Sequence, residues 1–123
     1  MPEQSLRDRR ILVVEDEYML ADDLRAELDE AGAVVVGPAG TVEDAMALIG
    51  SGEPIDGAVL DVNLRGEPVF PAADALAERG VPFLFTTGYD QSAIPERFER
   101  VPRCEKPIDM ARVAREIGRA IHA

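Results

Sequence analysis

The sequence predicts a single α/β domain in which a parallel β-sheet lies between two layers of helices. Short apolar runs alternate along the chain with stretches whose apolar residues recur at helical spacing. Glycine or proline separates most of these segments. The apolar runs are continuous rather than alternating with polar residues, which is typical of strands that are covered on both faces.

Five runs of aliphatic and aromatic residues are predicted to form the strands. They are residues 11–14, 33–36, 57–61, 81–88 and 103–105. Gly37 and Pro38 are expected to stop the second strand. In the central strand, small and aliphatic residues run directly into Asp61, and a loop that ends in Gly66 follows.

The segments between the strands are predicted to be helices. They are residues 18–31, 42–49, 69–79, 92–101 and 109–120. Thr41 and Asp109 have the side chains that cap helix N-termini, and each stands directly before a helical pattern. The fourth helix lies between Pro95 and Pro102, so we expect it to be short and mobile.

The predicted order is therefore strand–helix repeated five times within one domain, residues 1–123, with a core from about residue 10 to 121. Right-handed crossovers turn such an order into a three-layer sandwich with a parallel sheet. We expect the strand order 2-1-3-4-5, which is the flavodoxin-like (βα)5 arrangement.

The bulk composition excludes several classes of partner. A formal net charge of −11 argues against nucleic-acid binding and against anionic membrane surfaces. No apolar run approaches the ~20 residues of a membrane helix, and the polar start lacks the apolar core of a signal peptide. A single cysteine, Cys104, fits a reducing compartment, so we expect a cytoplasmic protein.

Polar residues stand at the predicted carboxyl ends of four strands, where open parallel sheets bind their ligands. They are Glu15, Asp16, Asp61, Thr87 and Lys106. In the expected strand order these side chains converge. Each pair of carboxylates ~4 Å apart would cost about 4 kcal/mol at an effective dielectric of roughly 20. No arginine is expected beside them, so either their pKa values rise or a hard cation enters, and oxygen-only ligands favour Mg²⁺.

Asp61 and Lys106 also have ordinary interpretations. Asp61 taken alone fits a helix cap or the start of a turn equally well. Lys106 could be a surface residue before a proline, but it is the only lysine in a chain that otherwise uses arginine. A compact ammonium suits a tight site, and a Lys–Pro bond has access to the cis form that would aim the side chain inward.

Thr87 and Gly88 close the fourth strand with a hydroxyl and a tight turn. A threonine can donate to a phosphoryl oxygen, and glycine leaves room for a phosphate. Thr86 precedes them, and strand alternation points one threonine into the site and the other away. Both threonines also fit a simpler interpretation as β-branched strand residues.

Together, these segments resemble the receiver domain of bacterial two-component response regulators. The resemblance rests on 13–17, 59–61, Thr87-Gly88 and Lys106-Pro107, in order, and covers nearly the whole chain. The sequence 85–89 further resembles stand-alone receivers with a Phe-Ala-Thr-Gly motif, with Thr86 in place of alanine. The resemblance implies a signalling domain without an output domain, and not an enzyme.

The resemblance also implies roles and partners. Asp61 would accept a phosphoryl group from a sensor histidine kinase or a histidine phosphotransfer protein, and the signal would pass to a downstream protein. Glu15, Asp16, Asp61 and the main-chain carbonyl of Asn63 would hold Mg²⁺. Thr87 and Lys106 would contact phosphoryl oxygens. Many receivers carry a switch aromatic where this chain has Arg103, so Thr87 would couple instead to Tyr89 or Phe98.

Three other functions remain open from the sequence. A small phosphohydrolase with an aspartate nucleophile commonly needs a second acid two residues on, where this chain has Asn63. A flavodoxin-like FMN protein needs a phosphate loop after the first strand, where Glu15, Asp16 and Glu17 would repel phosphate. A degenerate receiver that acts only by docking would not need the intact acids and Lys106.

Overall fold

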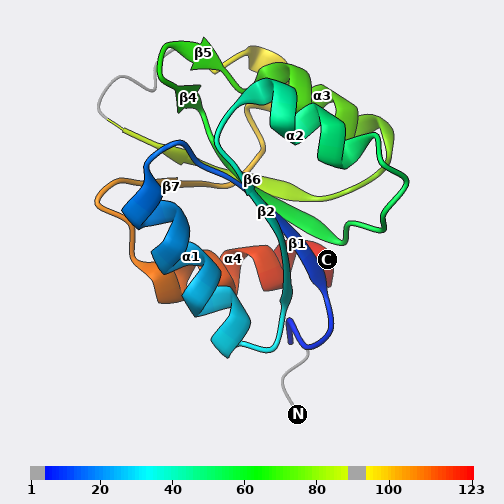
Figure 1. Ribbon diagram of the computed structural model, residues 1–123, viewed down its shortest axis with the longest axis vertical. Helices are drawn as coiled ribbons and strands as arrows, with labels where there is room; N and C mark the ends of the chain where they lie inside the picture. Colours follow the sequence, from blue (N-terminus) through cyan, green and yellow to red (C-terminus); the bar gives the residue numbers. More distant parts are fainter. Residues whose placement is uncertain (1–4, 89–93) are drawn as a thin grey trace.

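The computed structural model describes residues 5–88 and 94–123, and within them five strands form one parallel sheet (Figure 1). The strands are β1 (Arg10–Val14), β2 (Val34–Ala39), β3 (Gly57–Asp61), β6 (Phe83–Thr87) and β7 (Arg103–Glu105). Their spatial order is β2-β1-β3-β6-β7, with every neighbouring pair parallel. This is the predicted order 2-1-3-4-5, so the flavodoxin-like prediction is confirmed.

Helices cover both faces of the sheet (Figure 1). α1 (Tyr18–Glu30) and α4 (Met110–Ile121) pack on one face. α2 (Val42–Ile49) and α3 (Phe70–Glu78) pack on the other. The predicted caps are present, because Thr41 and Asp109 accept hydrogen bonds from main-chain N–H groups three residues on.

Alternation along each strand divides the core between the two faces. The strand residues that pack with α2 and α3 are Leu12, Val14, Val36, Ala39, Ala58, Leu60, Phe83 and Phe85. Those that pack with α1 and α4 are Ile11, Val13, Val59, Leu84 and Cys104. The same alternation continues to the carboxyl ends of the strands, so it decides which face each polar residue there belongs to.

The predicted end of the second strand is wrong. β2 continues through Gly37 and Pro38 to Ala39, where the main-chain oxygen accepts a hydrogen bond from Glu15 N at 2.9 Å. The register with β1 shifts between Leu12 and Val14. β2 is an edge strand, so the missing N–H of a proline does not break the sheet.

The predicted fourth helix is also wrong in the part that the structure describes. Residues 94–101 contain only a 3-10 helix, η2 (Glu96–Phe98), between Pro95 and Pro102, so four α-helices rather than five are found among the described residues. Ser92 and Ala93 lie outside the described residues. η2 is held against α3 because Arg97 donates two hydrogen bonds to Asp74, both at 2.9 Å.

The loop after Asp61 contains a small hairpin that the sequence did not reveal. β4 (Asn63–Leu64) pairs antiparallel with β5 (Glu67–Pro68). Arg65 and Gly66 form the turn with φ values of 55° and 89°. Positive φ at both positions is typical of tight hairpin turns, although arginine is an uncommon residue there. Asn63 Oδ1 supports the turn by accepting a hydrogen bond from Gly66 N.

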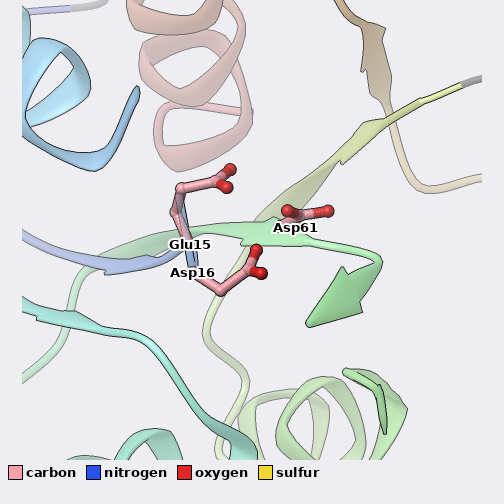
Figure 2. A group of neighbouring side chains, drawn as sticks. All are labelled: Glu15, Asp16 and Asp61. Carbon is pink, nitrogen blue, oxygen red and sulfur yellow. The ribbon is translucent and has the colours of Figure 1, made fainter. Parts of the chain in front are cut away.

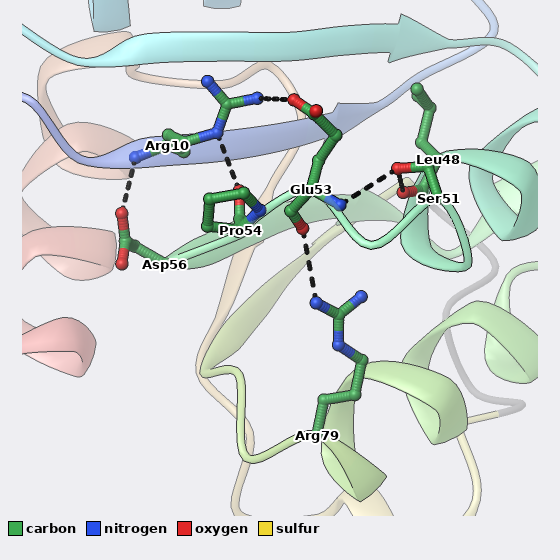
Figure 3. Close-up of polar contacts among 7 residues, drawn as sticks. All are labelled: Arg10, Leu48, Ser51, Glu53, Pro54, Asp56 and Arg79. Carbon is green, nitrogen blue, oxygen red and sulfur yellow. Dashed lines mark hydrogen bonds and ion pairs between the residues drawn. The ribbon is translucent and has the colours of Figure 1, made fainter.

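The amino end of the sheet is held by two arginines (Figure 3). Arg10 donates to Asp56 Oδ2 through its main chain, and to Pro54 O and Glu53 Oε1 through its guanidinium, each at 2.8 Å. Arg79, just after α3, donates to the carbonyl oxygens of Ile49 and Glu53. These contacts fix the loop between α2 and β3, and with it the start of the central strand.

None of the helices in the described ranges, 5–88 and 94–123, has the length and apolar character needed to cross a membrane.

Candidate functional site

Three carboxylates meet at the carboxyl end of the sheet (Figure 2). Glu15 and Asp16 follow the end of β1, and Asp61 is the last residue of β3. One oxygen from each lies within 4.8 Å of the others. Glu15 and Asp61 are each only 3% exposed, whereas Asp16 is half-buried. The sheet order places β1 beside β3, and this brings together acids that are far apart in sequence.

Lys106 enters this cluster from the loop after β7. Its Nζ lies 3.0 Å from Asp61 Oδ2 and 3.6 Å from Glu15 Oε2. The Lys106–Pro107 peptide bond is cis. The alternative interpretation of Lys106 as an ordinary surface residue is therefore wrong, because its ammonium is engaged with two buried carboxylates.

Main-chain N–H groups also donate to the two buried carboxylates of the cluster. Asn63 N donates to Asp61 Oδ1, and Glu17 N donates to Glu15 Oε2, both at 3.1 Å. Both oxygens of Asp61 thus have a fixed donor. The proposed role of the Asn63 carbonyl as a metal ligand stays a prediction, although the Asn63 main chain does lie beside Asp61.

Burial and crowding change the proton affinity of the cluster. Burial, followed by the charge of Asp61, raises the pKa of Glu15 from 4.5 to about 8. Burial lowers the pKa of Lys106, but the hydrogen bond and charge of Asp61, together with Glu15 and Glu17, outweigh it and leave that pKa above its ordinary value. Lys106 is therefore a permanent cation, while Glu15 can hold a proton near neutral pH.

The expectation that no arginine lies beside the acids is wrong. Arg65 Nε lies 3.4 Å from Asp16 Oδ2, because the β4–β5 hairpin turns the Arg65 side chain back over the site. Arg65 is largely exposed, so this ion pair is weak and screened by solvent. It does not offset the crowding of the buried carboxylates.

The two threonines at the end of β6 are both fully buried, and the structure gives neither hydroxyl a partner among the described residues. Thr87 follows Phe85 by two residues and shares its side of the sheet, toward α2 and α3. Thr86 follows Leu84 by two and lies on the other side, with Asp61. Alternation therefore assigns Thr86 and Asp61 to one side and Thr87 to the other, and the predicted contact of Thr87 with a phosphoryl group stays a prediction.

The predicted switch residues are only partly described. Tyr89 lies outside the described residues. Phe98 is buried, and its ring centroid lies between 5.6 and 5.9 Å from those of Phe70, Phe83 and Phe85, so it serves core packing. Arg103, at the position of the usual aromatic, lies half-buried in β7.

The acid cluster fits a hard divalent cation. It offers carboxylate oxygens without nitrogen or sulfur donors, as Mg²⁺ prefers. Glu15 Oε1 is buried and has no partner among the described residues, so it is available to a cation or its water. Lys106 does not fully compensate the two buried carboxylates that it contacts, because burial and the charge of Asp61 still raise the pKa of Glu15.

The sequence analysis missed Arg65 and the Glu17 main chain, and it left open which of Thr86 and Thr87 faces the site. The Arg-Gly pair between two polar residues could have suggested a turn, but not that it faces Asp16. No sequence pattern indicates that the Glu17 N–H donates a hydrogen bond to Glu15. Thr86 was recognised as adjacent to Thr87, yet the register that pairs it with Asp61 appears only in the sheet.

Comparison with solved structures places the chain among known proteins. The solution structure of SdrG from Sphingomonas melonis Fr1 matches with a TM-score of 0.81 at 39% identity, over 100% of both chains. The BeF3-activated conformation of SdrG from Pseudomonas melonis Fr1 matches at 42% identity and a TM-score of 0.70, over 85% of this chain and 89% of that one. The response regulator PhyR from Brucella abortus matches at 28% identity and a TM-score of 0.76, over 97% of this chain and 50% of PhyR.

Among curated proteins, the transcriptional regulatory protein PdtaR from Mycobacterium tuberculosis is 32% identical over 90 residues, which are 72% of this chain and 43% of PdtaR. The chain thus spans less than half the length of this relative. No protein-family model matches the chain. With the full-length match to SdrG, the fold and the site, the chain belongs to the receiver domains of bacterial two-component response regulators.

Proposed function

We propose that this receiver accepts a phosphoryl group on Asp61. The observation that carries the proposal is the position of the Asp61 carboxylate. It is buried at the end of the central strand, bound by the only lysine of the chain, and flanked by two further acids. A buried structural aspartate needs a cation, but it does not need two more carboxylates beside it.

The reaction is an in-line transfer from the phosphohistidine of a partner protein. An oxygen of Asp61 forms a bond to phosphorus while the bond between phosphorus and the imidazole nitrogen breaks. The imidazole keeps the electron pair of that bond and takes up a proton. The N–H of Asn63 holds Asp61 in position, and Lys106 stabilises negative charge on the transferred oxygens.

Glu15, Asp16, Asp61 and the Asn63 carbonyl would hold Mg²⁺, which when bound neutralises negative charge on the phosphoryl oxygens. Residues of the chain hold the Asp61 carboxylate in position. Because one oxygen of Asp61 is bound by Asn63 N and the other by Lys106, the carboxylate cannot rotate away from an incoming phosphorus atom. Hydrolysis of the acyl phosphate returns the site to its starting state.

The signal is proposed to leave by protein contact. Thr87 has a buried, unpartnered hydroxyl at the end of β6, directly before the segment that contains Tyr89. A phosphoryl group on Asp61 adds acceptor oxygens beyond the ends of the strands, where they can accept a hydrogen bond from this hydroxyl. We propose a receiver of the SdrG type, which the match over 100% of both chains supports. Its partners would be a histidine kinase or phosphotransfer protein and a downstream protein.

The test is phosphorylation of purified protein by a small acyl phosphate donor with Mg²⁺, read by intact mass and by mapping of the modified residue. We expect one added phosphoryl group on Asp61 that is lost in Asp61→Asn. Asp56→Asn is the matched control, because Asp56 lies at the opposite end of the same strand and is expected to leave labelling unchanged. Undiminished labelling of Asp61→Asn rules out the site. Turnover of the donor without a labelled protein would favour a phosphohydrolase, and no reaction at all would favour a docking-only domain.

A further inference from the structure

Thr86 lies on the strand between the two that position Asp61 and Lys106. Asp61 is on β3 and Lys106 follows β7, and β6 lies between these two strands. Neighbouring strands are about 4.8 Å apart, so Lys106 must reach across β6 to contact Asp61 Oδ2. On β6, Thr86 is the register partner of Asp61 on one side and of Cys104 on the other.

Thr86 also faces the same side of the sheet as the ion pair. Its alternation partner Leu84 packs in the core with α1 and α4, as do Val59, two residues before Asp61, and Cys104, two before Lys106. The Thr86 side chain is 0% exposed. Its hydroxyl has no hydrogen-bond partner among residues 5–88 and 94–123. A buried hydroxyl without a partner is uncommon, and here it lies beside the reacting carboxylate.

We propose that Thr86 is a positioning residue whose hydroxyl accepts a hydrogen bond from the Lys106 ammonium when Asp61 carries a phosphoryl group. The inference deepens the proposed function and rests on it. The Thr86 hydroxyl has no hydrogen-bond partner among the described residues because the Lys106 ammonium is directed at Asp61 Oδ2. It gains its partner only in the loaded site.

The reason is a redistribution of charge. Transfer of a phosphoryl group turns the Asp61 carboxylate into an acyl phosphate, so negative charge moves from Asp61 onto the phosphoryl oxygens. The Lys106 ammonium then interacts with the phosphoryl oxygens, and its hydrogen bond to Asp61 weakens. An ammonium has three N–H donors, and a hydroxyl on the floor of the site can accept one of them and fix the direction of the others. An interaction formed only in the loaded state favours loading without stabilising the empty protein.

The first test compares wild type with Thr86→Val and Thr86→Ser, using beryllium fluoride and Mg²⁺ as the probe and calorimetry as the readout. Valine keeps the shape and removes the hydroxyl, and serine keeps the hydroxyl. We expect Thr86→Val to bind the probe about fivefold more weakly and Thr86→Ser to stay within about twofold of wild type. Equal affinity of wild type and Thr86→Val would overturn the proposal.

The second test uses the single lysine of the chain. Labelling with ¹⁵N-lysine gives one side-chain ammonium signal, that of Lys106. Without metal and probe, we expect this signal to be the same in wild type and Thr86→Val, and the valine protein to be no less stable toward urea. With the probe bound, we expect the signals of the two proteins to differ, and Thr86→Ser to match wild type. Coincident signals of loaded wild type and Thr86→Val contradict the proposal.

The binding measurements distinguish a failure of the phosphoacceptor function from a failure of the Thr86 role. If wild type does not bind beryllium fluoride, the phosphoacceptor function is wrong, and the Thr86 role is wrong with it. If wild type binds and Thr86→Val binds equally well, the function stands and only the role of Thr86 is wrong. A Thr86→Val protein that is less stable but unchanged in affinity shows a purely structural threonine.

Discussion

The two ends of the same sheet are organised in opposite ways. At the amino end, Arg10 and Arg79 donate to carboxylate and carbonyl oxygens, and the Arg10 guanidinium forms an ion pair with Glu53 (Figure 3). At the carboxyl end, three carboxylates are crowded together (Figure 2), and Lys106 contacts two of them. Among the described residues, the buried side-chain atoms without a partner are Glu15 Oε1, Thr86 Oγ1 and Thr87 Oγ1, all at this end.

This difference agrees with the proposed function, in which the amino end stabilises the fold and the carboxyl end binds a ligand. A satisfied network holds the loop before β3 in one conformation. Buried groups without partners instead cost stability, and such groups are retained where a bound group completes them. The central strand runs from one end to the other, so the amino end provides the rigid base that fixes Asp61.

The largest effect is expected from removing Lys106, the cation that contacts the two buried carboxylates of the carboxyl end. Lys106→Met should weaken binding of beryllium fluoride with Mg²⁺ by about 100-fold, because a charged hydrogen-bond donor to the loaded group is lost. Calorimetry measures this change. Arg79→Met, which removes a cation from the amino end, serves as the control and should bind as wild type does. Equal losses in both variants would show that the two ends are not separate in function.

A smaller effect is expected from the proton held by Glu15. Its pKa is about 8 in the folded protein against an ordinary 4.5, so between these values the folded state binds more protons than the unfolded state. The free energy of unfolding of the metal-free protein should therefore fall as pH rises through this window, on the order of a few kcal/mol. Urea unfolding in the presence of a chelator measures it.

Two controls sharpen the pH prediction. Glu15→Gln should remove most of the fall, because it removes the titrating group. Saturating Mg²⁺ should also reduce the fall and raise the melting temperature, because the cation takes the place of the proton among the carboxylates. A pH profile that is the same with and without Mg²⁺ would argue against a metal site at this end of the sheet.

The smallest effect is expected at the amino end and on stability alone. Arg79→Met leaves the carbonyl oxygens of Ile49 and Glu53 without this donor. The free energy of unfolding should fall by about 1–3 kcal/mol in urea, and Mg²⁺ should not restore it. If this variant instead lost affinity for beryllium fluoride, the amino end would be coupled to the site through β3.

The sequence predicted the fold well where local patterns are strong. The apolar runs of β1 and β3, the caps Thr41 and Asp109, and the order of the five strands in the parallel sheet are all found in the structure. It failed where tertiary context overrides a local signal. Pro38 lies within β2 because an edge strand tolerates it, and the apolar stripe before Val101 forms only a 3-10 helix because proline limits it at each end.

Some features of the candidate site could likewise be predicted from the sequence, and others could not. The sequence by itself determined that acids, a hydroxyl and the only lysine follow apolar runs, since that arrangement is a property of the order of residues. Only the tertiary structure decided that Arg65 reaches Asp16, that burial raises the pKa of Glu15, and that Thr86 lies beside Asp61. The reason is that register between strands and exclusion of water depend on the packed sheet as a whole, and no short stretch of sequence encodes them.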